Sequence, residues 1–274
     1  MIVRAPATSA NVGPGFDCAA VALDLWNTLE VTDGSGVEIV GEGAGELPAD
    51  ETNLAVRAYA LAADPTGKRF RFTNDVPLER GLGSSAAAIA LGLVAAAPDA
   101  PAEELLALGL ELESHADNLA AALCGGACLT WEGRIAKVAE ALPFVPLVLV
   151  PASRVSTETA RGALPQQVSH ADAAFTAGRA ALLGAGLASG RADVLGAAFA
   201  DRLHEPFRAA AAPLLDAVRT RLPAGAAGAT LSGSGPSVVV WAEPARADEC
   251  EAALSRAFPA ARVLRLAVAP TGAR

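Results

Sequence analysis

The feature that most constrains the fold of this sequence is a loop with two glycines that leads directly into a long apolar run. Residues 77–85 read Pro-Leu-Glu-Arg-Gly-Leu-Gly-Ser-Ser, and Ala86–Ala97 are all small or apolar, which predicts a buried helix. Gly81 and Gly83 allow a positive φ and a close approach of the backbone to a ligand. The first turn of a helix offers unpaired N–H groups at the positive end of the helix dipole. This stretch therefore predicts a phosphate site at a helix N-terminus.

Three other interpretations of this glycine-rich segment can be compared with its sequence. A Walker-type loop needs a Lys after its second glycine, and none is present. The letters GLGSSA match the dinucleotide pattern G-x-G-x-x-A, but Pro77, Glu79 and Arg80 stand where that pattern needs a hydrophobic strand. A helix that begins without any ligand, capped by Ser84 or Ser85, remains an open alternative.

The length and charge of the chain limit what its partners can be. With 274 residues, the chain is long enough for about two domains. The formal net charge of −9 argues against nucleic acid and against an acidic membrane as partners, because both require a basic surface. The longest apolar run is too short to cross a bilayer, and Pro6 follows so soon after Met1 that we expect no signal peptide. We therefore expect a soluble, cytoplasmic protein.

The cysteines do not indicate a metal site. Only Cys124 and Cys128 are close in sequence, and no further Cys or His stands near them to complete a zinc site. We expect these two, together with Cys18 and Cys250, to be reduced thiols.

Hydrophobic periodicity and turn residues predict an alternation of strands and helices. Strands are expected at 2–5, 21–25, 27–32, within 34–45, and at 69–73, 127–131, 135–138, 147–150, 229–231, 237–241 and 263–268. Helices are expected at 53–62, 86–97, 102–112, 157–161, 171–188, 206–222 and 247–258. The segment Pro6–Asp17 is rich in Gly, Pro and small polar residues and is expected to be a loop. We place the domain boundary near Pro151.

Three loops in one order resemble the motifs of the GHMP small-molecule kinases, a superfamily that phosphorylates galactose, homoserine, mevalonate and related metabolites with ATP. These loops are Pro6–Asp17, Pro77–Ala88 and Thr230–Ser237. Within the superfamily, the first loop resembles that of the homoserine kinases, as do Glu113–Asn118, Ser156–Arg161 and His204–Arg208. The resemblance runs from Arg4 to about Ser237. The chain departs from the usual pattern at Ala20, Ser114 and Ser234, none of which removes a charged group.

The resemblance implies an α+β protein with a GHMP kinase-like two-domain fold. The N-terminal ATP-binding domain, residues 1–150, is expected to contain a mixed sheet with helices. The C-terminal domain, residues 151–274, is expected to be ferredoxin-like. A homodimer is expected from the family alone.

The resemblance also implies ATP as a cofactor with Mg²⁺, and it places the phosphates on the glycine loop. The residues expected to bind ATP are Pro77, Leu78, Glu79, Arg80, Gly81, Leu82, Gly83, Ser84, Ser85, Ala86 and Ala87. Adenine is expected near Asn53, although this Asn equally suits a helix cap. For the metal we select Ser85 and Glu111. Glu113 is the competitor, because Glu111 and Glu113 cannot share a face of one helix.

For the acceptor, the resemblance implies L-homoserine, which carries an ammonium, a carboxylate and a hydroxyl. Asp117 and Asn118 suit the ammonium and the hydroxyl, and Arg161 and Arg208 suit the carboxylate through bidentate pairing. The remaining residues expected to contact or close the acceptor site are Asn11, Asp17, His115 and Gly233. His115 either contacts the substrate or orients the loop. We count Asp117, Glu111 and Arg161 as the catalytic residues, and Asp117 either removes the hydroxyl proton or holds the ammonium.

Two other functions remain open at this point. One is a GHMP kinase for another small alcohol, but such an acceptor would not require two Arg and an Asp around it. A catalytically silent nucleotide-binding regulator would be expected to have lost Glu111 or Asp117, and both are present.

Overall fold

The first of two sheets is built on one long hairpin. The structure is a computed structural model that describes residues 1–274. The antiparallel strands β1 (Ile2–Asn11) and β2 (Gly15–Asp33) form its centre. The other strands are β3 (Val37–Gly41), β4 (Lys68–Asn74), β5 (Ala127–Trp131) and β6 (Arg134–Ala139), in the order β3-β4-β2-β5-β6 with β1 also on β2. Only the β3–β4 pair is parallel, so the sheet is mixed, as expected.

The loop that we expected at Pro6–Asp17 is largely strand. β1 continues through it to Asn11, and the chain reverses over residues 12–14. A register shift after Pro6 accommodates the proline, which cannot donate a ladder hydrogen bond. Asn11 (φ 69°) and Asp17 (φ 56°) have the left-handed conformation that Asn and Asp tolerate best. The small residues of this segment therefore form the bent tip of a hairpin.

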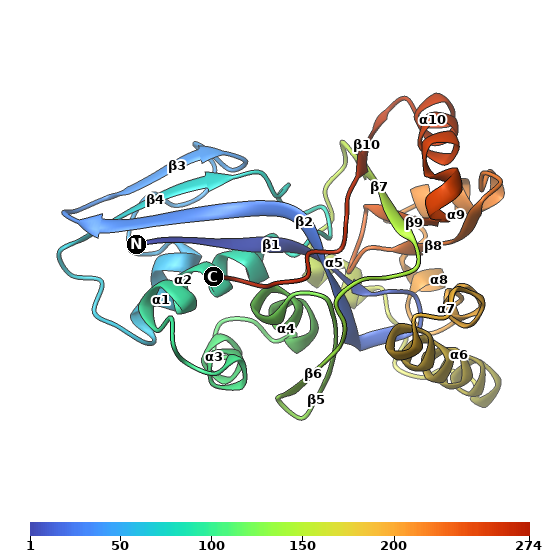
Figure 1. The fold of residues 1–274 in the computed structure, drawn as a ribbon, viewed down its shortest axis with the longest axis horizontal. Helices are drawn as coiled ribbons and strands as arrows, with labels where there is room; N and C mark the ends of the chain where they lie inside the picture. Colours follow the sequence, from blue (N-terminus) through green and yellow to red (C-terminus); the bar gives the residue numbers. More distant parts are fainter.

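Four helices cover one face of this sheet (Figure 1). They are α1 (Leu54–Ala60), α2 (Ser84–Ala96), α3 (Ala102–Gly109) and α4 (Ala116–Cys124). The central helix α2 is buried on nearly all sides, which explains why its sequence shows no polar face. A Cβ on Gly92 of α2 would lie 2.1 Å from the carbonyl oxygen of Ala55, so α1 and α2 pack at a distance that only small residues permit. The predicted apolar helix is thus confirmed.

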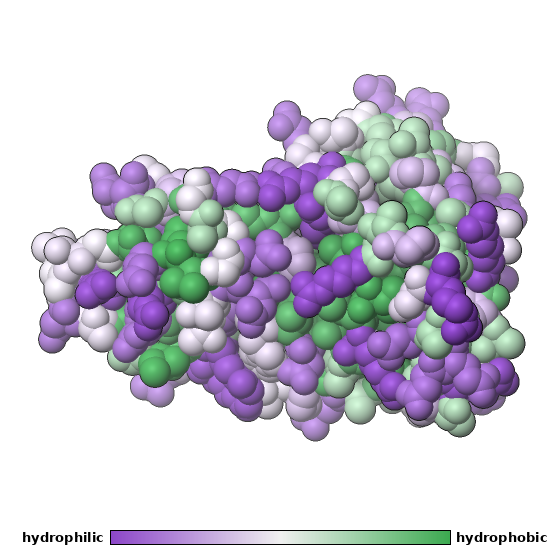
Figure 2. Space-filling model, turned by 90° about the horizontal axis from the view of Figure 1, so that it is seen from above, coloured by the Kyte–Doolittle hydropathy of each residue, from purple (hydrophilic) through white to green (hydrophobic).

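The opposite face of the first sheet carries no helices in Figure 1. Along β4, Phe70 and Phe72 are buried whereas Arg69 and Arg71 are exposed, as expected for a sheet with one solvated face. Arg69 pairs with Glu38 of β3 at 3.0 Å. Figure 2, which views the molecule from above, shows hydrophilic and hydrophobic patches mixed on that side.

The second sheet has the ferredoxin-like arrangement that the resemblance implies. Its strands β7 (Val145–Pro151), β8 (Ala226–Leu231), β9 (Val238–Ala242) and β10 (Ala261–Arg265) are antiparallel in the order β10-β7-β9-β8. The helices are α5 (Thr157–Gly162), α6 (His170–Ser189), α7 (Ala192–Ala198), α8 (Glu205–Arg208), α9 (Leu214–Thr220) and α10 (Ala247–Ala257), with a 3₁₀ turn, η1, at Pro244–Arg246. The helix expected at 206–222 is interrupted, and Pro213 is the N-cap of α9.

The two sheets share part of their core. Leu23 of β2, Val148 of β7, Leu183 of α6 and Trp241 of β9 belong to one buried cluster. The chain passes to the second sheet between β6 and β7, so β7 lies with the C-terminal strands, whereas our boundary near Pro151 falls at its end. After β10 the chain returns to the first sheet, where Val268 bridges to Leu23. The exact division into two domains stays a prediction. None of the helices has the length and apolarity needed to span a membrane.

Candidate active site

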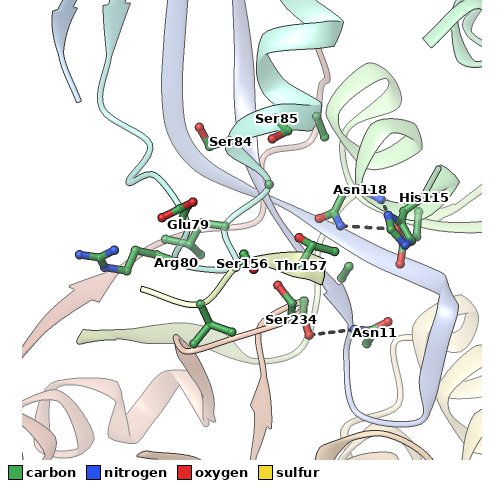
Figure 3. Close-up of a pocket in the computed structure, with 18 of the residues that line it drawn as sticks. Asn11, Glu79, Arg80, Ser84, Ser85, His115, Asn118, Ser156, Thr157 and Ser234 are labelled. Carbon is green, nitrogen blue, oxygen red and sulfur yellow. Dashed lines mark hydrogen bonds between the residues drawn. The ribbon is translucent and has the colours of Figure 1, made fainter. Parts of the chain in front are cut away.

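A cleft between the two halves of the molecule brings together segments that are far apart in sequence. Its walls come from the tip of the β1–β2 hairpin, the loop before α2, the start of α4, the segment around α5, and α8 with the loop after β8. Figure 3 shows Ser84 and Ser85 at the start of α2, with His115 and Asn118 from the start of α4 facing the same cavity. The cleft therefore joins the three loops that the sequence singled out.

The start of α2 presents backbone N–H groups to this cleft. Gly81 (φ 71°) and Gly83 (φ 66°) both have the positive φ that we expected. The first helical hydrogen bond runs from the N–H of Ala87 to the carbonyl oxygen of Gly83. The N–H groups of Ser84, Ser85 and Ala86 precede that bond, and no side chain caps the helix. Such a helix start is an anion-binding arrangement.

Packing within the protein requires both glycines. A Cβ on Gly81 would lie 2.1 Å from the carbonyl oxygen of Ser232, and one on Gly83 would lie 1.8 Å from Thr8 Oγ1. The N–H of Thr8 donates to the carbonyl oxygen of Leu82 at 3.0 Å. The loop before α2 is thus wedged between β1 and the loop that follows β8.

Most of the residues expected to bind ATP line the cleft, with exceptions. Leu78 and Ala87 are buried outside its lining. Arg80 lines it, but its guanidinium donates to the carbonyl oxygens of Leu78 (3.1 Å), Pro151 (2.9 Å) and Ala152 (2.7 Å). Arg80 therefore fastens this loop to the end of β7, and its donors are largely used.

Asn53 is a helix cap and does not line the cleft. Its side-chain oxygen accepts from the N–H of Ala55 at 3.0 Å, and its side-chain amide donates to the carbonyl oxygen of Pro48 at 2.9 Å. Of the two roles that we left open for Asn53, the geometry supports the cap.

The preference for Glu111 over Glu113 does not agree with the geometry. Glu111 is exposed and lies outside the cleft, whereas Glu113 lines it and pairs with His115 at 2.8 Å. The helical-face argument failed because α3 ends at Gly109, so neither residue lies on a helix. The hydrogen bond between Glu113 and His115 raises the pKa of His115.

Asp117 is the most deeply buried acid of the cleft. It stands in the first turn of α4, 3% exposed, and burial raises its pKa to about 6. Its neighbour Asn118 uses its side-chain oxygen to accept a hydrogen bond from the Thr8 hydroxyl at 2.6 Å. An acid that titrates close to neutral pH and faces a cleft is suited to binding a cation or to moving a proton.

The two expected carboxylate-binding arginines converge on the same cleft. Arg161 Nη2 donates to Asp17 Oδ1 at 2.6 Å, and its Nε is buried without a partner. Arg208 is 3% exposed and donates through Nη1 to the carbonyl oxygen of Gly233 at 3.1 Å. Asn11 also donates to that oxygen, at 2.9 Å, and so ties the hairpin tip to the loop after β8. All eight residues expected at the acceptor line this one cleft: Asn11, Asp17, His115, Asp117, Asn118, Arg161, Arg208 and Gly233.

Known proteins match both halves of the chain. The family description "GHMP kinases N terminal domain" matches residues 53–126, and "GHMP kinases C terminal" matches residues 173–260. A homoserine kinase from Streptomyces avermitilis is 43% identical over 90% of this chain and 87% of its own length. One from a Nostoc species is 37% identical over 95% of this chain and 92% of its own.

The chain belongs to the GHMP kinase family. The predicted fold class is confirmed, and family membership implies a phosphotransferase that uses ATP. The crystal structure of homoserine kinase from Cytophaga hutchinsonii has a TM-score of 0.88 and 30% identity, covering 100% of this chain and 96% of that one. The mevalonate kinase of Methanococcus jannaschii has a TM-score of 0.68 at 15% identity and shares the fold alone.

Sequence reasoning missed several residues that line this cleft of the GHMP kinase. Besides Glu113, they are Ala10, Val155, Ser156, Thr157 and Ser234. Ser156 and Thr157 lie in a segment that the resemblance had already marked, but only its Arg was given a role. Ser156 also caps α5 by accepting from the N–H of Thr159 at 3.1 Å. Ser234 follows Gly233, so its place in the third loop was the available signal.

Proposed function

We propose that this GHMP kinase transfers the γ-phosphoryl group of ATP to the side-chain hydroxyl of L-homoserine. The product is O-phospho-L-homoserine, an intermediate of threonine biosynthesis. The observation that carries the proposal is one cleft in which Arg161, Arg208 and Asp117 lie next to an anion-binding helix start. Two homoserine kinases that are each 43% identical to this chain support the same substrate.

The substrate's two charged groups fit the side chains of the cleft. Arg161 and Arg208 hold the carboxylate, since a guanidinium pairs with a carboxylate through two parallel hydrogen bonds. Asp117 and Asp17 hold the ammonium. Asp17 pairs with Arg161 at 2.6 Å, so the zwitterion supplies each of them with a new partner of opposite charge.

On the donor side, the phosphates lie against the N–H groups at the start of α2. Mg²⁺ prefers oxygen ligands and is usually held by one or two carboxylates together with the phosphates. Ser85 and Glu113 fit this requirement, because both supply oxygen to the cleft and no larger cluster of acids is needed. The ion neutralises charge on the phosphates when it is bound.

The chemical step is an in-line displacement. The hydroxyl oxygen of homoserine bonds to the γ-phosphorus, the bond to the bridging oxygen of ADP breaks, and the hydroxyl proton departs. We assign Asp117 to the ammonium rather than to this proton, because a loose transition state lets the proton leave late.

The location and assembly of the protein are also proposals. All four cysteines are free thiols, which fits the reducing cytoplasm where ATP is available. The homodimer stays a prediction from the family.

The test is a panel of acceptor alcohols with ATP and Mg²⁺, followed by phosphorus NMR. L-Homoserine is expected to give one phosphate monoester for each ADP, whereas mevalonate and shikimate give none. Turnover of another alcohol with homoserine inactive would overturn the substrate and leave the kinase class intact.

A further inference from the structure

His204 is a fully buried histidine that the proposed reaction does not use. Its exposed fraction is 0%, and both ring nitrogens have hydrogen-bond partners. Nε2 lies 2.7 Å from the carbonyl oxygen of Gly13 at the hairpin tip. Nδ1 lies 3.1 Å from Arg208 Nη1. One side chain therefore connects the first strand hairpin to an arginine of the opposite half.

These partners determine the tautomer of His204. A guanidinium has no acceptor, so Nδ1 must accept from Arg208 and cannot carry a proton. The proton then resides on Nε2, which donates to Gly13. Burial lowers the pKa of His204 to about 4, so the ring is neutral at physiological pH.

The ring also packs against the hairpin tip. Phe16 stacks on His204 with the ring centroids 5.0 Å apart and the planes at 21°. The guanidinium carbons of Arg161 and Arg208 lie 5.6 Å and 5.4 Å from the centroid of Phe16. His204 thus contacts the segment between Asn11 and Asp17 as well as Arg208.

The backbone of His204 is itself held by buried acids. Asp201 Oδ2 accepts from the N–H groups of His204 (2.8 Å) and Glu205 (2.9 Å). Glu205 in turn accepts from the N–H of Leu231 at 2.8 Å and from Arg219 at 2.6 Å. The histidine is therefore fixed relative to the second sheet, and its ring holds Arg208 in a fixed place at the cleft.

We propose that His204 is a positioning residue of the acceptor site: it holds the Arg208 guanidinium and the β1–β2 tip in the arrangement that receives the substrate. The inference rests on the proposed function, in which Arg208 binds the carboxylate of homoserine. His204 acts through these groups and contacts no substrate itself.

Three substitutions separate the contacts of His204. His204→Asn places an oxygen near the position of Nδ1 and keeps the acceptor for Arg208. His204→Gln places a donor near the position of Nε2 and keeps the bond to Gly13. His204→Phe keeps the stacking on Phe16 and removes both bonds. His170→Phe, at an exposed histidine at the start of α6, is the matched control.

The kinetic readout is the KM for each substrate separately. His204→Phe and His204→Gln are expected to raise the homoserine KM by about tenfold to a hundredfold, as for loss of a hydrogen bond to a charged group. The ATP KM stays within about twofold, and His204→Asn recovers most of the homoserine affinity. Equal rises in both KM values, or no rise at all, would overturn the proposal.

A second readout does not depend on the substrate. In arginine-labelled protein, NMR is expected to show slow guanidinium rotation at Arg208, assigned by its loss in Arg208→Lys. Rotation becomes fast in His204→Phe and His204→Gln and stays slow in His204→Asn. If the wild type does not phosphorylate homoserine, the proposed function fails, and this measurement alone decides the positioning. Slow rotation in all three variants would refute it.

Discussion

The two sides of the proposed active-site cleft present charge and polar groups from different parts of the chain. On the donor side, three backbone N–H groups at the start of α2 face the cleft, and the nearby Arg80 is occupied by carbonyl oxygens. On the acceptor side, the charges are carried by side chains, and Arg208 is held by His204 and Gly233. Binding through backbone N–H groups depends on the conformation of the loop that carries them. Binding through charged side chains depends on the residues that hold each side chain in place.

This difference predicts where substitutions act. A change in the loop before α2 moves backbone that is packed against two other segments, so it affects stability as well as binding. A change on the acceptor side removes one charged group, so its main effect is expected on binding of the acceptor. The following predictions test this contrast, beginning with the largest effect.

Gly83→Val is expected to disrupt the fold around the loop as well as ATP binding. Its Cβ would lie 1.8 Å from Thr8 Oγ1 at a φ of 66°. Strain and overpacking together cost roughly 3 kcal/mol or more, a large part of the stability of a domain. Thermal unfolding is the measurement. A variant with the wild-type Tm that simply fails to bind ATP would show that the glycine serves the ligand alone.

Arg208→Ala is expected to weaken binding of the acceptor far more than binding of ATP. The lost charge-assisted hydrogen bonds cost roughly 1.5–3 kcal/mol, which raises the homoserine KM by about one to two orders of magnitude. The ATP KM is expected to change little, and Lys rescues poorly because an ammonium lacks the planar fork. Steady-state kinetics with each substrate varied in turn measure both values. An equal rise in the ATP KM would show that Arg208 does not act on the acceptor side specifically.

Glu113→Gln is expected to raise the Mg²⁺ concentration needed for half-maximal activity by about tenfold, because a carboxylate ligand is lost. The matched control Glu111→Gln is expected to behave as the wild type, since Glu111 lies outside the cleft. Glu113→Gln should also lower the pKa of His115, because the hydrogen bond with Glu113 raises that pKa. Mg²⁺ titration and a histidine NMR titration measure the two effects, and an effect of Glu111→Gln alone would restore our original choice.

The pH dependence is expected to report on Asp117. Burial raises the pKa of Asp117 to about 6, and only the ionised carboxylate attracts an ammonium. The kcat/KM for homoserine is therefore expected to fall about tenfold per pH unit below this pKa and to level off above it. His115 is a second titratable group of the cleft, and its hydrogen bond to Glu113 raises its pKa, so Asp117→Asn is the necessary control. A limb at about pH 6 that persists in Asp117→Asn belongs to another group.

Asn53→Ala is expected to have the smallest effect on catalysis. Loss of a helix cap costs about 1 kcal/mol, which lowers the Tm by roughly 2–4 °C. The ATP KM is expected to stay unchanged, because both ends of the Asn53 amide are already bonded within the protein. A rise in the ATP KM beyond about threefold, or roughly 0.7 kcal/mol, would return Asn53 to the adenine site.

The sequence was most informative where a motif combined side-chain charges. Arg161 and Arg208 were found because each lies in a segment that resembles the homoserine kinases, and the fold brings them together as expected. The choice of Glu111 over Glu113 assumes a helix that continues past Gly109, whereas α3 ends there and Glu113 is the residue that lines the cleft. The length of β1 was missed because its alanines, Thr8 and Ser9 lack the alternation of a one-sided strand. The network behind Arg208 depends on tertiary contacts that single-sequence patterns do not record.

The most direct test compares L-homoserine with 3-amino-1-propanol, which keeps the amine and the hydroxyl but has no carboxylate. In the wild type, kcat/KM is expected to favour homoserine strongly, and Arg208→Ala is expected to lose most of that preference while its activity on the amino alcohol changes little. If Arg208→Ala loses as much activity on 3-amino-1-propanol as on homoserine, Arg208 serves the fold or the phosphate, and the account of the acceptor side is wrong.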